Sequence, residues 1–365
     1  VHRVTFNEIT KLAVEEAVAN HKDVNSNLVD AAKVRRFMDR LVGYRCSKFA
    51  RSWNLKSMGR VQTPTLGYIV ERELEREAHV PIPFHSVRAT SDGYNFKVRF
   101  HEKEDEGAWF DDDGKHFPDR TFDGEHAEAV HGAITDSGIL RVVSIRDGKN
   151  RRKPPAPFTT DTLLQAASSS LGWSMGKTSK IASDLYQAGH ITYIRTDSTR
   201  TSESARNAVK ELIKEKYGED FLGPGSLGAD AKKGSSNVQD AHEAIRPTSP
   251  ASEEVDGVEA DHKRLYRLVW SRFASSQMSE SIRERRDLRA SVDGIEQELA
   301  GTASWLVHSG WEEASSEFLP DPRRSQPKFD LQIGSEWKLD EGDENPLLTI
   351  DETKPPRRFS ESSIV

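Results

Sequence analysis

The hydrophobic pattern of this chain switches between a helical and a strand period, and the switches divide it into four consecutive parts. Leu28–Val42 carries apolar residues at helical spacing, whereas Tyr94–Phe100 alternates apolar and polar residues as a strand does. Proline-rich breaks at 79–83 and 153–157 mark two of the boundaries. A β domain that an inserted helical domain interrupts explains this order economically. The expected domains are 1–79 (helical), 80–157 (β-rich), 158–280 (inserted, helical) and 281–365 (β-rich).

Capping residues predict where individual helices begin and end. Asn7 is a candidate N-cap for a helix through Val18, and Asn27 precedes the helix over Leu28–Val42. Pro64 is suited to a first helical turn. Thr201-Ser202-Glu203 predicts the start of a helix that Gly218 ends.

Strand patterns fill most of the remaining chain. We expect strands from Phe84 to Ile145, with a loop over the acidic stretch 102–125. Strands return in Leu288–Val292 and Ser304–Val307. The Gly- and Ser-rich stretch 223–238 predicts a flexible loop.

The length and the cysteine content restrict the class of protein. A chain of 365 residues is expected to form two to four domains. No apolar run is long enough for a membrane span, and Val1 opens no signal peptide. The single cysteine, Cys46, excludes an internal disulfide framework and a multi-cysteine zinc ribbon, and it fits a reducing, cytoplasmic setting. Because the chain lacks an initial methionine, we expect it to be a piece of a longer protein.

The distribution of charge is more informative than the net charge of −7. Residues 33–60 hold nine basic side chains against one acidic side chain, Asp39. Such a surface is compatible with phosphate binding, and a solvated helix face is the alternative. The nine are Lys33, Arg35, Arg36, Arg40, Arg45, Lys48, Arg51, Lys56 and Arg60.

One short stretch points to a specific reaction. Gly189–Ser198 places Tyr193 two residues before Arg195, directly after a helical pattern that ends in glycine. If this stretch is extended, the two side chains project from the same face. A phenol beside a guanidinium is suited to nucleophilic attack on a phosphodiester, with the cation stabilising the oxyanion. The alternative is a tyrosine that only packs.

Two further segments suit phosphate contact, and two apparent motifs fail. Ser57–Gln62 carries a glycine, an arginine and an amide before a helix N-terminus, although a plain helix-entry turn explains it equally. His242 is titratable and close to Arg246, so it suits phosphate contact or proton transfer, or alternatively a polar helix start. The same segment lacks the second histidine of a zinc-protease helix. Gly172–Thr178 is one residue too short for an ATP-binding phosphate loop.

Taken together, these segments resemble the central part of a type IA DNA topoisomerase, along the whole chain. The tyrosine segment and the His-Glu-Ala-Ile-Arg-Pro segment are the most specific. The matching segments, in order, are Phe6–Thr10, Arg35–Tyr44, Gly59–Gln62, Pro157–Thr160, Ile191–Ser198 and Ala241–Pro247.

The resemblance implies an enzyme that cleaves one DNA strand through a 5′-phosphotyrosine link, passes a strand through the gap and reseals it without ATP. Tyr193 would be the nucleophile, Arg195 would position the scissile phosphate, and His242 would contact phosphate or relay a proton. An ordinary phenol has a pKa near 10, so cations or a base must activate it. Single-stranded DNA would contact Phe6, Asn7, Thr10, Arg35, Arg36, Arg40, Ser57, Met58, Gly59, Arg60, Val61 and Gln62.

The resemblance also implies a mixed α and β multidomain fold, with a β-rich arch that a helical, winged-helix-like domain carrying Tyr193 interrupts. The family's Mg²⁺-binding acidic domain is missing, so no metal ligands are expected here, and the chain alone should be inactive in relaxation. We expect a monomer. The alternatives are a non-catalytic winged-helix-type DNA-binding protein and the topoisomerase module of a reverse gyrase.

Overall fold

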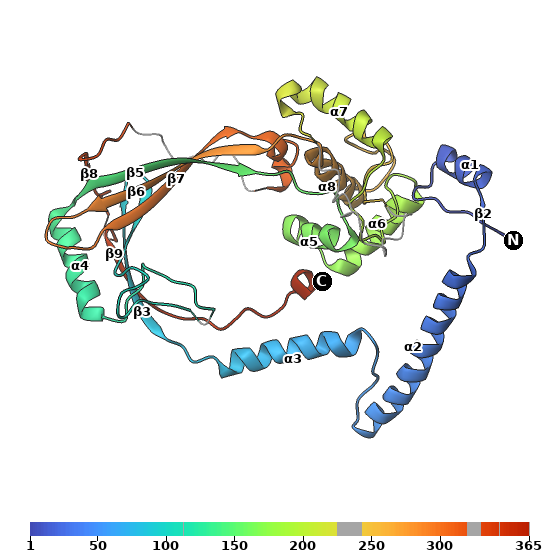
Figure 1. Cartoon of the computed structure of the whole chain (residues 1–365), viewed down its shortest axis with the longest axis horizontal. Coiled ribbons are helices and arrows are strands. Elements are labelled where there is room, and N and C mark those ends of the chain that lie inside the picture. The colour runs from blue at the N-terminus through green and yellow to red at the C-terminus, as the bar shows by residue number, and fades with distance from the viewer. Residues whose placement is uncertain (112, 225–242, 320–329, 343, 365) are drawn as a thin grey trace.

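The computed structural model describes residues 1–111, 113–224, 243–319, 330–342 and 344–364. The elements form an open ring, with a curved sheet on one side, a bundle of helices on the other and long helices below (Figure 1). Two separate hydrophobic cores hold the sheet and the bundle. Within the described ranges, no helix has the length and apolar character needed to cross a membrane.

The first part of the chain is helical and extended. Its helices leave most of their apolar side chains exposed, and in the longest of them only Ala50 is buried. Ser47 fixes the turn that follows this helix, because its hydroxyl bonds both the N–H and the carbonyl of Met58. The elements are β1 (His2–Arg3), α1 (Lys11–Ala19), β2 (Lys22–Asp23), α2 (Ser26–Ser52) and α3 (Gln62–Ala78).

Two predicted helix starts are wrong by a few residues. Thr10, not Asn7, caps α1, and its hydroxyl accepts the N–H of Ala13 at 3.3 Å. The carbonyl of Asn7 is used elsewhere, in a bond to the tyrosine stretch. Asn25, not Asn27, caps α2, which also continues well beyond the predicted end. A cap needs its side chain in front of the first turn, and propensity alone does not say which of two nearby candidates lies there.

The sheet has seven strands in the order β8-β5-β6-β7-β4-β3-β9, and each neighbouring pair is antiparallel. Strands from before and after the helical bundle therefore lie together in one sheet, with β5 next to β6 and β4 next to β7. The strands are β3 (Pro83–Ser91), β4 (Tyr94–Val98), β5 (Ile139–Arg152), β6 (Ser281–Ser291), β7 (Leu299–His308), β8 (Glu336–Lys338) and β9 (Leu347–Glu352).

A helix that the strand pattern did not predict covers part of the sheet. α4 (Gly124–Ser137) begins after the cap Asp123 and ends at Gly138, which has a left-handed backbone with φ of 61°. Its buried side chains, Val130 and Ile134 among them, pack on the sheet's core. These side chains recur at helical spacing. The stretch is short and lies between strands, so its helical period was not recognised.

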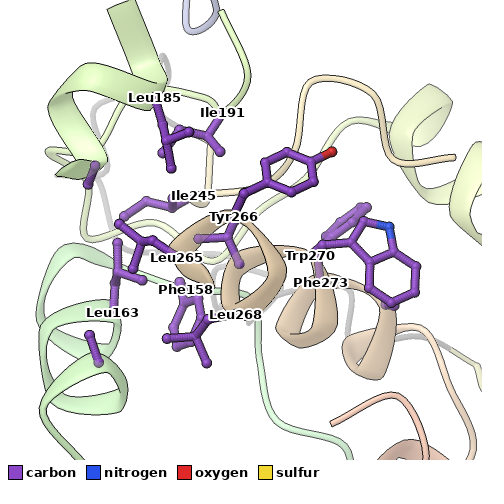
Figure 2. Close-up of a cluster of buried hydrophobic side chains, with 14 of the residues drawn as sticks. Phe158, Leu163, Leu185, Ile191, Ile245, Leu265, Tyr266, Leu268, Trp270 and Phe273 are labelled. Atoms are coloured by element: carbon purple, nitrogen blue, oxygen red, sulfur yellow. The ribbon is translucent and has the colours of Figure 1, made fainter. Parts of the chain in front are cut away.

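The inserted bundle is built around α8 (Ala260–Ser276), whose apolar face lies in the middle of the core (Figure 2). The helix at 203–217 begins and ends as predicted, with Ser202 as N-cap and Gly218 as C-cap. The other three helices of the bundle are α5 (Thr160–Leu171), α6 (Met175–Gln187) and α7 (Glu203–Tyr217).

The last described residues leave the sheet and return to the helices. After β9, the chain follows α3, where Arg358 pairs with Glu73 at 2.6 Å. It ends in α9 (Glu361–Ile364), where the Glu361 carboxylate accepts the N–H of Met175 at the start of α6.

The chain passes from the sheet to the bundle and back at a single place. Arg152 ends β5 and Ser281 begins β6, and the two residues are paired in register. The Glu312 carboxylate is 2% exposed there, and it accepts bonds from the Ser281 hydroxyl at 2.7 Å and from Arg283 at 2.7 and 2.8 Å. A guanidinium nitrogen of Arg152 lies 3.7 Å from it. We call these four residues the junction cluster.

Two opposing influences within the junction cluster determine the pKa of Glu312. Burial acts to raise this pKa, but the hydrogen bonds from Arg283 and Ser281 outweigh burial, so the pKa lies below its ordinary value of 4.5. A carboxyl group whose pKa is lower in the folded state stabilises the fold at pH values above its unfolded-state pKa. This contribution is lost as the pH falls below about 4.5.

We predict that Glu312→Gln lowers the free energy of unfolding at pH 7 by about 3 kcal/mol, because it leaves the largely buried Arg283 guanidinium without its counter-charge. It should also weaken the fall in stability between neutral and acidic pH. Urea unfolding at several pH values measures both effects. Glu317→Gln is the control, since its exposed carboxylate pairs with Arg267 at 3.3 Å. Equal losses in the two variants would contradict a special role for the junction cluster.

Candidate active site

The tyrosine stretch begins where α6 ends. Gly189 follows the last turn with φ of 77°, a backbone conformation that favours glycine. A Cβ atom at this position would lie 2.6 Å from the carbonyl oxygen of Ile9. The glycine therefore lets the N-terminal segment approach the start of the tyrosine stretch closely.

The tyrosine stretch is not a strand, so the condition under which Tyr193 and Arg195 would share one face of a strand is not met. Ile191 forms an isolated bridge with Pro247, and no ladder continues through Tyr193 and Arg195. The reason is that the backbone bonds of the stretch go to several segments, including residues 6–8 and 244–248. Tyr193 is half-buried and Arg195 is exposed, so strand alternation does not relate the two side chains.

Tyr193 lies against both the N-terminal segment and α6. Its backbone N–H donates to the carbonyl of Asn7 at 2.7 Å. Its ring meets the ring of Tyr186 edge to face, with centroids 5.3 Å apart. Burial raises the pKa of Tyr186, and the neighbouring Tyr193 phenol adds to the rise. The ring and the backbone of Tyr193 are thus both held.

Thr192 ties the tyrosine stretch to the segment after residue 242. Its hydroxyl donates to the carbonyl of Ala244 at 2.7 Å and accepts the N–H of Arg246 at 3.0 Å. Its own N–H donates to the carbonyl of Arg246 at 2.9 Å. Ile191 and Ile245 lie next to these bonds in the core of the bundle (Figure 2). The backbone of Tyr193 is therefore anchored on a packed core.

A buried arginine joins the site to the N-terminal segment. Arg246 is 6% exposed and forms ion pairs with Glu243 at 2.6 Å and with Glu8 at 3.1 Å. It also donates to the carbonyl of Pro247 at 3.0 Å. Thr10 donates to the second partner, Glu8, at 3.1 Å. Glu8 and Arg246 both lie in motifs of the sequence, but no local pattern predicts a role for either, since only the fold brings them together.

The other predicted site residues lie in three places. Phe6 is exposed, whereas Asn7 and Thr10 are half-buried beside the tyrosine stretch. Arg35, Arg36 and Arg40 are exposed on α2, which runs away from the bundle (Figure 1). His242 lies outside the described residues. The segment Ser57, Met58, Gly59, Arg60, Val61 and Gln62 forms the turn into α3, as predicted.

That turn is held by its own side chains. Gln62 donates to the Ser57 hydroxyl at 3.1 Å, and the N–H of Gly59 donates to the hydroxyl of Thr63 at 3.2 Å. Arg60 pairs with Asp39 at 2.5 Å. The rejected phosphate-loop motif also has a structural explanation, because Gly172 ends α5 and Ser174 caps α6.

A second basic surface, on the sheet, was not predicted. Arg99, Arg146, Arg285 and Arg289 line an open groove of about 420 Å³ across β5, β6 and β7. Nearby acids such as Asp287, 2.7 Å from Arg285, offset part of the charge. The alternating arginines of β6 were a readable signal, since residues two apart share a face of a strand.

The described residues do not supply a metal centre. Among them, no group of three or more His, Cys, Asp or Glu side chains is arranged to hold a metal ion. The chain's own described side chains therefore do not fit the Mg²⁺ site that the resemblance implies.

Comparison with known proteins decides the family. A family profile described as DNA topoisomerase matches residues 23–365. The chain belongs to the type IA DNA topoisomerases. It is 36% identical to DNA topoisomerase 1 of Salmonella typhimurium over 379 residues, and 33% identical to that of Thermotoga maritima over 383 residues. The structure of full-length topoisomerase I from Thermotoga maritima superposes with a TM-score of 0.79 at 30% identity, covering 99% of this chain.

This topoisomerase chain corresponds to only part of its relatives. It covers 40% of the Salmonella protein, 54% of the Thermotoga protein and 57% of the chain in the Thermotoga structure. The fold confirms the expected mixed α and β architecture with a curled antiparallel sheet.

We predict that Thr192→Val lowers the free energy of unfolding of this topoisomerase chain by about 2 kcal/mol, because two buried backbone groups lose their partner. Urea unfolding followed by tryptophan fluorescence measures the change. Thr135→Val is the matched control, since its hydroxyl bonds the carbonyl of His131 on an exposed face of α4. A loss no larger than that of the control would show that water replaces the Thr192 hydroxyl.

Proposed function

We propose that this chain is the part of a type IA topoisomerase that cleaves and reseals one strand of DNA, with Tyr193 as the nucleophile. The supporting observation is the position of Tyr193, a half-buried phenol where the N-terminal segment meets the bundle, followed by the exposed Arg195. A nucleophile whose backbone is held from both sides presents its oxygen to a phosphodiester in one orientation. This restriction lowers the entropic cost of attack.

The proposed step conserves the number of phosphodiester bonds. The Tyr193 oxygen forms a bond to phosphorus, the bond from phosphorus to the 3′ oxygen breaks, and that oxygen leaves as a hydroxyl with a proton. The 5′ phosphate stays on the tyrosine. Resealing is the reverse attack by the 3′ hydroxyl, so ATP is not needed. Arg195 would stabilise charge on the phosphoryl oxygens, and His242 would contact phosphate or carry the proton.

DNA would approach along basic surfaces of the chain. The exposed arginines of α2 and the turn into α3 suit the backbone of a single strand. The arginine groove of the sheet offers a second surface for phosphates. Any Mg²⁺ would be held by carboxylates outside the described residues, and no step above is assigned to it. We further propose a monomeric cytoplasmic enzyme, in keeping with the unpaired Cys46.

We predict that Tyr193→Phe abolishes the covalent adduct between the complete gene product and single-stranded DNA, because the attacking oxygen is missing. Adducts that survive denaturant are counted on a gel with a labelled oligonucleotide. The affinity of the variant for the same oligonucleotide should stay within about twofold of the unaltered protein, since phosphate contacts supply most of the binding. Tyr186→Phe, which keeps the edge-to-face ring contact, is the control and should retain the adduct.

This experiment also separates the proposed enzyme from a non-catalytic DNA-binding protein. If the unaltered protein forms no adduct and both variants bind DNA equally, the catalytic proposal is wrong. A reverse gyrase would form the same adduct, because its additional part lies outside this chain.

We predict that single-stranded DNA binding by this chain weakens as salt rises, and that Arg36→Glu with Arg40→Glu weakens it further at low salt. The slope of log affinity against log salt should become shallower by about 0.7 for each phosphate that the variant no longer neutralises. Fluorescence anisotropy of a labelled oligonucleotide measures the slope. Arg141→Glu, which alters an exposed arginine of β5, is the control. An affinity independent of salt would contradict the proposed binding surface.

A further inference from the structure

The N-terminal segment Phe6–Thr10 is the part of the first helical region that contacts the tyrosine stretch. It precedes α1 and reaches across to the end of α6 (Figure 1). Three contacts join it to the bundle there. They are the bond from the Tyr193 N–H to the Asn7 carbonyl at 2.7 Å, the Glu8–Arg246 ion pair at 3.1 Å, and the packing of the Ile9 carbonyl against Gly189.

The three contacts differ in strength. One neutral backbone bond and one glycine contact contribute little specificity by themselves. The Glu8–Arg246 pair is charged, its arginine side chain is 7% exposed, and it joins residues 238 positions apart in the sequence. Removing Glu8 leaves Arg246 paired with Glu243 at 2.6 Å, so what is lost is the charged contact between the two segments.

Arg246 is also linked to the residue that precedes the nucleophile. It exchanges bonds with Thr192 through both its N–H and its carbonyl, and Thr192 immediately precedes Tyr193. Glu8 immediately follows Asn7, which accepts the Tyr193 N–H. The pair therefore completes a closed loop of contacts around the backbone of Tyr193. The loop runs from Glu8 through Arg246 and Thr192 to Tyr193, and it returns to Glu8 through Asn7.

We propose that Glu8 and Arg246 are positioning residues for Tyr193. Their ion pair clamps the tyrosine stretch between the N-terminal segment and the bundle, and its release lets the bundle move away with Tyr193. Neither residue contacts the reacting atoms in this role. The proposal rests on the proposed function of Tyr193, but the clamp itself is a property of the DNA-free chain.

The arrangement of the ring supports release at this place. The bundle is joined covalently to the sheet, whereas contacts without a chain connection join it to the rest of the ring. One is the clamp, and another is the bond from the Met175 N–H to Glu361 in the C-terminal segment. That bond is exposed, whereas the clamp contains a buried charge. Separation of the bundle from the N-terminal segment therefore requires this charged contact to break.

The clamp is tested by the distance between spin labels on this chain without DNA. Leu12→Cys on α1 and Lys180→Cys on α6 place labels at exposed positions on either side of the clamp, in a Cys46→Ser background. We expect Glu8→Ala to increase the population at longer distances about tenfold, as loss of one charge-assisted bond predicts. Glu8→Gln keeps an acceptor at this position and should give a smaller shift.

Glu15→Ala is the matched control, because Glu15 lies on α1 and pairs only locally with Lys11 at 3.9 Å. Its distance distribution should equal that of the unaltered chain. If Glu8→Ala also equals the unaltered chain, the clamp proposal is overturned. Circular dichroism of each variant checks that the helices are retained, so that a shift reports movement and not unfolding.

A second measurement addresses positioning in the complete gene product. Glu8→Ala should lower the maximal rate of adduct formation about tenfold, and leave the oligonucleotide concentration at half-maximal rate within about twofold. A change confined to the half-maximal concentration would overturn the positioning role. If Tyr193 forms no adduct at all, the proposed function fails on its own, and the distance measurement still decides the clamp.

Discussion

The buried carboxylate of Glu312 is the interaction on which the arrangement of this protein depends most. The chain passes from sheet to bundle after Arg152 and returns at Ser281, so both connections lie side by side. Two adjacent connections would leave the bundle free to swing if nothing fixed their angle. The junction cluster does so, because one carboxylate accepts bonds from both β6 residues, Ser281 and Arg283, and lies near the end of β5. Charge-assisted bonds in a buried place fix direction as well as distance.

Much of the fold could be read from the sequence, and the failures share a cause. Ser202 and Gly218 predicted α7 correctly because capping is local chemistry. Asn7 misled the prediction of α1 because its carbonyl serves the tyrosine stretch, a tertiary contact that no local pattern contains. α4 was missed because its short apolar stripe lies between strands. The family's segments, in contrast, were recognised without any knowledge of their contacts.

In the candidate site too, the sequence predicted the local chemistry but not the tertiary contacts. Tyr193 and Arg195 were found from side-chain chemistry, but the stretch does not form a strand, because the surrounding hydrogen bonds go to separate segments. Arg246 has no local feature that marks it as buried, since arginine is mostly a surface residue. Its burial follows from two carboxylates, Glu243 three residues earlier and Glu8, which the fold delivers from a distant part of the chain. Such a role depends on tertiary contacts, which the local sequence does not contain.

The two ends of the bundle are held by different kinds of contact, and this difference limits how the ring can open. At the junction cluster the chain itself connects the sheet and the bundle, so separation there would require unfolding. At the clamp, side chains and one backbone bond make the connection, so separation costs only those interactions. The bundle has a core of its own, packed around α8 and separate from the core of the sheet, so opening of the clamp would leave its packing intact. Tyr193 lies at the end held by the clamp, which is the arrangement that its proposed role as nucleophile requires if a covalently held DNA end is to be carried apart from the other.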